Sequence, residues 1–306
     1  MTRLLLVGAN GQVGRELRRS LARLGEVVAA TRDGRLDEDA CRAVDLADRQ
    51  ALIHLVRETA PSAVVNAAAY TAVDRAESER EVAFQANAEA PGALAHACAG
   101  LGIPFVHYST DYVFDGEGTR PYREDDPVAP LGVYGASKLA GEQAVRDAGG
   151  RHLIFRTAWV YAAHGHNFLR TMLRLGAERE ELRVVADQTG APTPAALIAD
   201  VTAVALAKAL AGNAPMAGLW HLVADGQTTW HGFAEAIFAE ATAAGLLSRA
   251  PRVLPIGTAD YPTPARRPAY SCLDTSRLRH DFGVVLPAWE RGLGGVVDEL
   301  IQRRLA

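Results

Sequence analysis

Two side chains that can transfer protons stand four residues apart, at Tyr134 and Lys138. In a helix, that spacing places both side chains on one face. A free tyrosine has a pKa of about 10, and a neighbouring ammonium group lowers that pKa because it favours the phenolate. Thr110, at the end of an apolar run, could hold a carbonyl in line with the tyrosine. The three side chains suit general acid–base chemistry, but the spacing is common and depends on its context.

A glycine-rich turn follows the first apolar run, Leu4–Val7, with glycines at Gly8, Gly11 and Gly14. Such a turn lets the backbone approach a pyrophosphate closely, and the helix after it offers N–H donors and a partial positive charge. The third glycine allows the helix to pack on the strand. The turn therefore predicts a dinucleotide site. The residues expected to contact the dinucleotide here are Gly8, Asn10, Gly11, Gln12 and Val13.

The end of the next predicted strand, Val27–Thr31, bears on the choice of cofactor. An acidic side chain at this point would bond the ribose 2′-hydroxyl of NAD. The chain has Arg32 there, whose guanidinium matches a 2′-phosphate, so NADPH is favoured over NADH. The alternative is that Arg32 is a solvated arginine beside Asp33, which leaves NADH open. Asp45 and Leu46 are expected to flank the adenine.

The elements that must position these groups alternate between short apolar runs and helical patterns over the first 160 residues. This alternation predicts an α/β, Rossmann-like, doubly wound parallel sheet with right-handed crossovers. Ligands of such sheets gather at the carboxyl ends of the strands, where Thr110 and the glycine turn stand. The predicted strands are 4–7, 27–31, 41–46, 63–68, 103–109 and 153–161, and the predicted helices are about 13–24, 52–56, 77–99 and 134–148.

The pattern changes beyond Tyr161. We expect residues 1–161 to form the NAD(P)-binding Rossmann domain and residues 162–306 to form mainly a smaller C-terminal substrate-binding domain. A segment at about 195–223 is expected to return to the Rossmann sheet. Thr229 is a candidate helix cap. The helices expected in this half are about 167–177, 195–211, 229–238 and 292–303, with a strand at 219–223.

Composition limits the classes of function. The net charge of −4 argues against a nucleic-acid partner. The three cysteines are odd in number and lack a CxxC pair, so neither a disulfide framework nor a zinc site is expected. The first apolar run is too short for a secretion signal, and no run reaches the roughly 20 apolar residues of a membrane span. We expect a cytoplasmic protein without a membrane partner, and a homodimer stays open.

Taken together, these motifs resemble the extended short-chain dehydrogenase/reductase family, and within it the reductases of dTDP-activated 4-keto-6-deoxy sugars. The resemblance covers nearly the whole chain and is far more specific than any single motif. The segments that carry it are Gly8–Gly14, Asn66–Asp74, His107–Phe114, Val133–Lys138, Arg156–Tyr161, Asn167–Phe168, Asp187–Thr193 and Ala265–Pro268.

The resemblance implies that NADPH reduces the C4 keto group of a dTDP-4-keto-6-deoxy sugar. Tyr134 would protonate the forming alkoxide, Lys138 would lower the tyrosine pKa and bind the nicotinamide ribose, and Thr110 would hydrogen-bond the carbonyl. The cofactor residues that it implies are Ala67, Ala68, Ala69, Tyr70, Tyr134 and Lys138. The substrate residues that it implies are Thr110, Asp111, Tyr134, Trp159, Asn167, Gln188, Thr193, Arg266 and Arg267.

Two other functions fit the same fold. One is a sugar-nucleotide dehydratase or epimerase. Dehydratases of this kind carry a second acid after the aspartate at this position, whereas Tyr112 follows Asp111 here, and Arg32 fits an exchanging NADPH better than a tightly held NAD. Some relatives are non-catalytic regulatory subunits of methionine adenosyltransferase, against which the intact set of Thr110, Tyr134 and Lys138 argues. Some relatives also bind Mg²⁺ through glutamates at a dimer contact. Glu16 is a candidate for one such position, but we assign no metal ligand.

Overall fold

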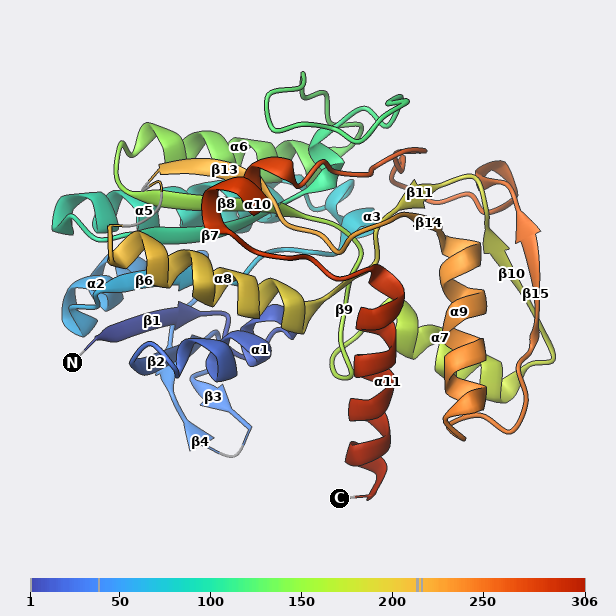
Figure 1. Cartoon of the computed structure of the whole chain (residues 1–306). Coiled ribbons are helices and arrows are strands. Elements are labelled where there is room, and N and C mark those ends of the chain that lie inside the picture. Colours follow the sequence, from blue (N-terminus) through green and yellow to red (C-terminus); the bar gives the residue numbers. More distant parts are fainter. Residues whose placement is uncertain (1, 38, 213–214, 216, 306) are drawn as a thin grey trace.

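The protein is described by a computed structural model that covers residues 2–37, 39–212, 215 and 217–305. Its centre is a seven-stranded sheet in the order β13-β8-β7-β6-β1-β2-β5, and each neighbouring pair is parallel (Figure 1). The predicted Rossmann-like α/β fold is confirmed. The strands are β1 (Arg3–Val7), β2 (Glu26–Thr31), β5 (Arg42–Ala43), β6 (Ala63–Asn66), β7 (Phe105–Thr110), β8 (His152–Thr157) and β13 (Ala217–His221).

Helices cover both faces of the sheet, which explains why its central strands are continuous apolar runs. In β1, Leu4 and Leu6 point into one core and Leu5 and Val7 into the other, as the two-residue period of a strand requires. The first core is closed by α1 (Gln12–Leu21), α8 (Ala195–Leu210) and α10 (Ser276–Phe282), and the second by α2 (Arg49–Thr59), α5 (Ala90–Leu101) and α6 (Val133–Asp147).

A third core lies in the second half of the chain, where Phe233 and Ile237 are fully buried. Figure 1 shows this part beside the sheet, opposite the chain's N-terminus. Thr229 caps its helix as predicted, since Oγ1 accepts the Gly232 N–H at 3.0 Å. The elements of this part are α7 (Phe168–Glu178), α9 (Trp230–Ala243), α11 (Trp289–Leu305) and the parallel pair β10 (Glu181–Val185) and β15 (Arg252–Ile256).

Two short strand pairs lie between the sheet and the third core, and the first of them joins the two halves of the chain. In one, β9 (Val160–Tyr161) pairs with β12 (Thr193–Pro194), and in the other β11 (Thr189–Gly190) pairs with β14 (Thr228–Thr229). The segment after β12 returns to the first half, because α8 packs on α1 and β13 pairs with β8. A domain boundary at residue 161 stays a prediction. None of the described helices is long and apolar enough to cross a membrane.

Several predicted elements are wrong in detail. The strand expected at 41–46 is reduced to β5, because the chain first forms a hairpin of β3 (Arg35–Leu36) and β4 (Asp39–Ala40). The helix expected at 77–99 begins only at Arg80 and is divided into α4 (Arg80–Phe84), a π-helical turn (Gln85–Glu89) and α5, and a separate short helix, α3 (Val73–Ala76), precedes it. The strand expected at 153–161 is interrupted at Trp159, whose φ of +48° no strand residue adopts. The sequence pattern also missed β10, β15 and α10.

Close packing of α6 on the π-helical turn generates the first prediction. A Cβ on Gly141 would lie 2.0 Å from the Asn87 carbonyl oxygen, so Gly141→Ala must push the helix outward. We expect a loss of about 1–3 kcal/mol in the free energy of unfolding, measured by urea denaturation. In the control Gly294→Ala on α11, where a Cβ meets nothing within 4 Å, helix propensity should leave stability equal or up to about 1 kcal/mol higher. Equal stabilities of the two variants would contradict the packing argument.

Candidate active site

The predicted site residues meet where the strand order reverses, between β1 and β6. After β1 the chain moves to β2 on one side and later to β6 on the other, which opens a crevice at the carboxyl ends of the two strands. The glycine turn and the segment 67–70 touch there, because a Cβ on Gly8 would lie 2.5 Å from the Ala68 nitrogen. This is the place where a doubly wound sheet binds a dinucleotide.

The glycine turn has the shape of a phosphate cradle. Gly8 has a φ of +82°, and its N–H donates to the Ala30 carbonyl at 2.9 Å. A Cβ on Gly14 would lie 2.0 Å from the Gly8 oxygen, so only glycine fits. Gly11 begins α1 without a side-chain cap, which leaves the helix N–H groups directed toward the crevice. Of the other residues expected here, Asn10 is exposed, Gln12, Val13 and Ala69 are half-buried, and Leu46 is buried.

Thr110 ends β7, and Tyr134 lies in the first turn of α6. Thr110 Oγ1 donates to Asp111 Oδ1 at 2.9 Å and accepts the Tyr112 N–H at 3.2 Å. Burial raises the pKa of Tyr134 to about 12, the hydrogen bond with Thr110 lowers it, and the Asp111 charge raises it. The tyrosine therefore keeps its proton at neutral pH, the state that a general acid needs.

Lys138 lies one turn after Tyr134 and is 3% exposed. Its Nζ donates to the Tyr108 carbonyl at 2.5 Å. Burial lowers the pKa of Lys138 to about 8, and the charge of Glu142 opposes that fall. Lys138 is not among the causes of the altered pKa of Tyr134, so the lowered tyrosine pKa expected from the sequence is not found. The cost of burying a phenolate dominates instead.

Asn87, which the sequence pattern did not reveal, ties the cofactor segment to the catalytic helix. It is fully buried in the π-helical turn. Its Oδ1 accepts the Tyr70 N–H at 2.8 Å, and its Nδ2 donates to the Tyr70 carbonyl and to Ser137 Oγ, each at 3.0 Å. Ser137 in turn donates to the Tyr134 carbonyl at 2.8 Å. Its sequence neighbours Gln85 and Glu89 are polar too, so nothing in the local pattern marked Asn87 as the buried one.

The chain beyond β2 lies where the adenosine ribose is expected. The Arg32 side chain is 80% exposed, and its Nε is 3.9 Å from Asp45 Oδ2. The carboxylate of Asp33 is engaged locally, since Oδ1 accepts from Thr31 Oγ1 at 3.0 Å and from the Arg35 N–H at 3.2 Å. The bond from Thr31 is the largest cause of the lowered pKa of Asp33. Arg32 is therefore the group that extends toward a ribose substituent.

Trp159 occupies a strained position beside the carboxyl end of β8. Its φ is +48°, and its ring stacks on Trp230 with centroids 3.5 Å apart and an interplanar angle of 5°. A Cβ on Gly190 would lie 2.5 Å from the Trp159 ring, so only glycine lets β11 come this close to the ring. A strained residue persists only where its surroundings hold it. Trp230, at the start of α9, was missed because an aromatic there is also typical of a core.

Three residues expected at the substrate use their polar atoms within the chain. Asn167 caps α7 and donates Nδ2 to Gln12 Oε1 at 2.8 Å, which links the second half to the glycine turn. Thr193 is fully buried and bonds the Ala191 carbonyl and the Ala224 N–H. Gln188 donates to Thr258 Oγ1 at 3.0 Å. These contacts are those of residues that hold the site together.

The arginine pair expected near the pyrophosphate is divided. Arg267 forms a two-pronged ion pair with Asp74, with distances of 3.1 and 2.8 Å, and also bonds Thr263. The bond from Arg267 lowers the pKa of Asp74. Arg266 is exposed. The segment that holds both arginines is thus fastened to the segment after β6, next to the expected cofactor.

Asp111 is a buried acid beside the catalytic hydroxyl groups. It is 1% exposed, and its Oδ2 has no hydrogen-bond partner among the described residues. Burial raises the pKa of Asp111 to about 6, although hydrogen bonding with Ser271 and Thr110 lowers it. An unpartnered carboxylate oxygen next to Thr110 is directed where a polar ligand would find an acceptor.

Glu16, the candidate metal position, is engaged by cations. Its Oε1 lies 3.0 Å from His164 Nε2, and its Oε2 lies 3.6 Å from Arg19. Hydrogen bonding with His164 is the largest cause of the lowered pKa of Glu16, and Arg303 adds to it. No three His, Cys, Asp or Glu side chains gather as metal ligands in the described part of the chain. These surroundings do not fit Mg²⁺, and we assign the metal no role.

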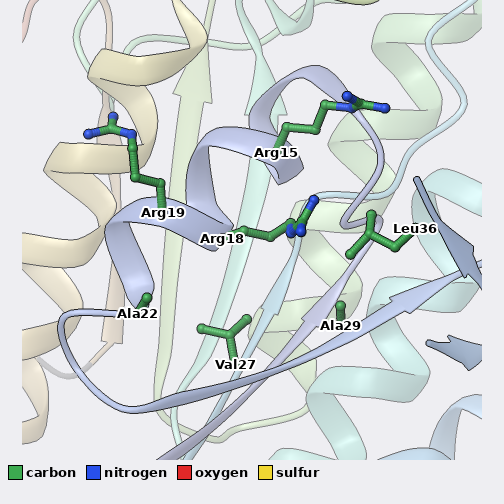
Figure 2. Close-up of a pocket in the computed structure, with 7 residues that line it drawn as sticks. All are labelled: Arg15, Arg18, Arg19, Ala22, Val27, Ala29 and Leu36. Atoms are coloured by element: carbon green, nitrogen blue, oxygen red, sulfur yellow. The ribbon is translucent and has the colours of Figure 1, made fainter. Parts of the chain in front are cut away.

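A cavity of about 570 Å³ lies on the outer side of α1, and none of the predicted site residues lines it (Figure 2). Arg15, Arg18 and Arg19 project from the helix around it. Arg15 and Arg18 pair with Asp37 at 3.0 and 3.2 Å, and Arg19 pairs with Asp200 at 3.3 Å. Because acids of the same chain pair with these cations, the cavity does not indicate an anionic ligand.

The chain is similar over nearly its whole length to proteins of known activity. The family model described as RmlD substrate binding domain matches residues 1–302. A dTDP-4-dehydrorhamnose reductase of Burkholderia thailandensis is 51% identical over 306 residues, 98% of this chain and 100% of that protein. The reductase of the same name from Escherichia coli K12 is 49% identical over 298 residues, 97% of each chain. A Bacillus anthracis structure of that name in complex with NADP has a TM-score of 0.86 and 35% identity, covering 98% of this chain and 100% of that one.

The raised pKa of Asp111 predicts a dependence of stability on pH. The folded chain binds this proton more tightly than the unfolded chain, so ionisation of Asp111 costs stability as pH rises from about 4 through about 6. The free energy of unfolding of Asp111→Asn, relative to that of the wild type, should therefore rise by up to roughly 3 kcal/mol between pH 4 and pH 7. Urea unfolding at both pH values measures this difference. The exposed control Asp298→Asn should follow the wild type, and a pH-independent difference for Asp111→Asn would refute the assignment.

Proposed function

The chain belongs to the RmlD substrate binding domain family, and from that membership we propose that it reduces dTDP-4-dehydro-6-deoxy-L-mannose to dTDP-L-rhamnose. The reduction takes place at the C4 keto group and uses NADPH. The observation that supports the proposal is that Thr110, Tyr134 and Lys138 lie together near the carboxyl end of β7, the strand next to β6.

The residues present fit a nicotinamide dinucleotide phosphate. The turn from Gly8 to Gly14 offers backbone N–H groups in a place that a Cβ would fill. Arg32 stands where a 2′-phosphate would lie, and the neighbouring Asp33 is engaged by Thr31. When bound, the cofactor supplies the hydride.

The chain's own groups would hold the keto sugar and move one proton. Thr110 donates to the C4 carbonyl oxygen and keeps it beside the phenol of Tyr134. Tyr134 gives its proton to that oxygen as negative charge develops there. Lys138 donates one of its three N–H groups to the Tyr108 carbonyl, and the other two would hold the ribose next to the tyrosine. An alkoxide is more basic than a phenolate. A tyrosine that stays protonated until hydride transfer can therefore give its proton to the alkoxide that forms.

The other two functions lack a supporting observation. A dehydratase would carry a second acid beside Asp111, but the next residue is Tyr112, a half-buried tyrosine whose ring meets that of Tyr134 edge-on with centroids 5.6 Å apart. Arg32 fits an exchanging NADPH better than the tightly held NAD of a dehydratase or epimerase. A regulatory subunit would not need three catalytic side chains gathered at the cofactor crevice.

The cellular location and the partners of the chain are also proposals. We propose a cytoplasmic location, because the three cysteines are free thiols and such thiols persist in a reducing compartment. We propose no nucleic-acid partner for a chain of net charge −4, and no membrane partner for an enzyme of water-soluble phosphate esters. A homodimer is tested by light scattering of the purified protein.

Tyr134→Phe tests the mechanism. It removes the proton donor and keeps the ring, so turnover of the keto sugar with NADPH should fall by two or more orders of magnitude, as loss of a general acid predicts. NADPH binding, measured by fluorescence, should persist. Tyr112→Phe, which alters the neighbouring ring, should retain far more turnover. Turnover that survives in Tyr134→Phe would leave the substrate standing and refute the mechanism, whereas binding without turnover in the wild type would refute the substrate.

Arg32→Ala tests the choice of cofactor. The charge-assisted bonds of an arginine to a phosphate are each worth about 1.5–3 kcal/mol, so kcat/KM with NADPH should fall at least about tenfold. The value with NADH should stay the same, because NADH lacks the phosphate. Arg57→Ala, an exposed arginine near the end of α2, is the control and should change neither value. Equal losses of kcat/KM with both cofactors would show that Arg32 does not bind the 2′-phosphate.

A further inference from the structure

One turn beyond Lys138, the catalytic helix carries a second buried charge, Glu142. It is 1% exposed, and a carboxylate at such a depth costs free energy unless it is paired and hydrogen-bonded. Nothing in the proposed chemistry calls for it, since the reaction uses Thr110, Tyr134 and Lys138. A charge so costly to bury at this point of α6 therefore needs a physical reason.

The partner of Glu142 is Arg156 on β8, which is also 1% exposed. Arg156 Nε donates to Glu142 Oε1 at 2.8 Å and Nη2 donates to Oε2 at 2.7 Å, the two-pronged geometry of the strongest ion pairs. The guanidinium lies over the ring of Phe114, 5.0 Å from its centroid. The pair fastens α6 to β8, and therefore fixes the distance between the sheet and the part of α6 that carries Lys138.

Glu142 also affects the protonation state of Lys138. The ammonium is buried and donates to one neutral carbonyl, that of Tyr108, which replaces only part of its hydration. Burial favours the neutral amine and lowers the pKa of Lys138, and the charge of Glu142 four residues away raises it. A neutral amine would lose one of its three N–H donors, of which one already bonds the Tyr108 carbonyl, and would bond the ribose less strongly.

The elements around α6 carry other titratable groups. His107 on β7 faces Lys138 and stays neutral, because burial and the Lys138 charge lower its pKa. Those on α4, on the π-helical turn and on α5 are exposed to solvent: Arg80, Glu81, Glu89 and His96. Arg146, one turn after Glu142 on α6, lies 3.7 Å from the Glu142 carboxylate and is half exposed to solvent. Other groups near α6 are Tyr134 on α6, Tyr108 on β7, Asp111 and Tyr112 on the turn after β7, Arg156 on β8, Asp74 and Arg75 on α3 and Glu77 after it. Among the described residues, Glu142 is the charge that alters the pKa of Lys138.

We propose that Glu142, held in place by Arg156, is a positioning residue that keeps Lys138 charged and directed at the cofactor ribose. The proposal rests on the reductase function for its kinetic consequence alone. Its electrostatic part concerns this chain's own residues and can be measured without substrate or cofactor.

The sequence makes a direct measurement practical, because it contains just two lysines, Lys138 and Lys208. Protein labelled with ¹³C at the lysine ε-carbon should give two side-chain signals, and Lys208→Arg assigns them. Each signal is followed from pH 6 to pH 11 in the wild type, where the Lys138 signal should titrate at about 8. Lys208, whose Nζ donates to the Phe282 carbonyl at the far end of α8, is the internal control.

Two variants remove the charge of Glu142. Glu142→Gln leaves Arg156 unpaired and can unfold the protein, so the double variant Glu142→Gln/Arg156→Met replaces the whole pair by neutral groups of similar size. In Glu142→Gln the Lys138 midpoint should fall by about one pH unit. In the double variant, which also loses the Arg156 cation, it should fall by less, and the Lys208 midpoint should stay unchanged in both. Asp147→Asn removes an exposed acid from the same helix and should move neither signal.

The kinetic arm separates the charge of Glu142 from a merely structural role. At pH 6 the double variant should turn over the keto sugar within about threefold of the wild type. At pH 9 it should be slower by up to about tenfold, because each pH unit by which the Lys138 midpoint falls leaves roughly a tenth of the charged amine.

The two readouts have distinct outcomes. A double variant that folds with an unchanged Lys138 midpoint would overturn the proposal. A lower midpoint in an enzyme that never reduces the sugar would support the role of Glu142 and refute the proposed function, so the two failures can be told apart.

Discussion

The close approach of α6 to the carboxyl half of the sheet is the constraint on which the active site depends. A Cβ on Gly135 would lie 2.1 Å from the Tyr112 carbonyl oxygen, and one on Gly141 would lie 2.0 Å from that of Asn87. With glycine at both points, the helix lies low enough for Lys138 to reach the Tyr108 carbonyl on β7. The same approach brings Tyr134 beside Thr110. Backbone contact at these two glycines thus sets the positions of Tyr134 and Lys138 relative to Thr110 on β7.

Such an approach carries a cost, because it buries polar and charged groups that water would otherwise solvate. The chain offsets that cost by pairing the buried polar groups with hydrogen-bond or ion-pair partners, not by replacing them with apolar groups. Asn87 satisfies both backbone groups of Tyr70 and also holds Ser137, and Glu142 meets Arg156 with two hydrogen bonds. Each pair joins a segment that faces the cofactor or substrate to the helix that carries the acid. The polar layer between α6 and the sheet is therefore a framework for the site and not a second site.

Local pattern was enough to predict the parts of this arrangement that are local. The strand, glycine turn and helix around Gly8 follow from apolar spacing, and the spacing of Tyr134 and Lys138 placed both on one helix face. Strand β15 was missed because Pro255 and a half-buried pattern hide an edge strand. The partners of Asn167 and Arg267 were missed because Gln12 and Asp74 lie more than 150 residues away along the chain. The direction of the Tyr134 pKa was wrong because burial, which spacing does not reveal, outweighs a neighbouring charge.

Those long-range contacts show how the second half of the chain takes part in the site. Asn167 joins the start of α7 to the glycine turn, and Arg267 joins the segment before α10 to the one after β6, so both sides of the dinucleotide crevice are fastened to the second half. Between them, Trp159 is held at a φ that an aromatic residue rarely adopts, by its stack on Trp230 from α9. Strain of this kind is retained only when several neighbours oppose its release. The second half therefore shapes the crevice through residues whose own polar atoms are already satisfied, which leaves Thr110, Asp111, Tyr134 and Arg266 to meet the ligands.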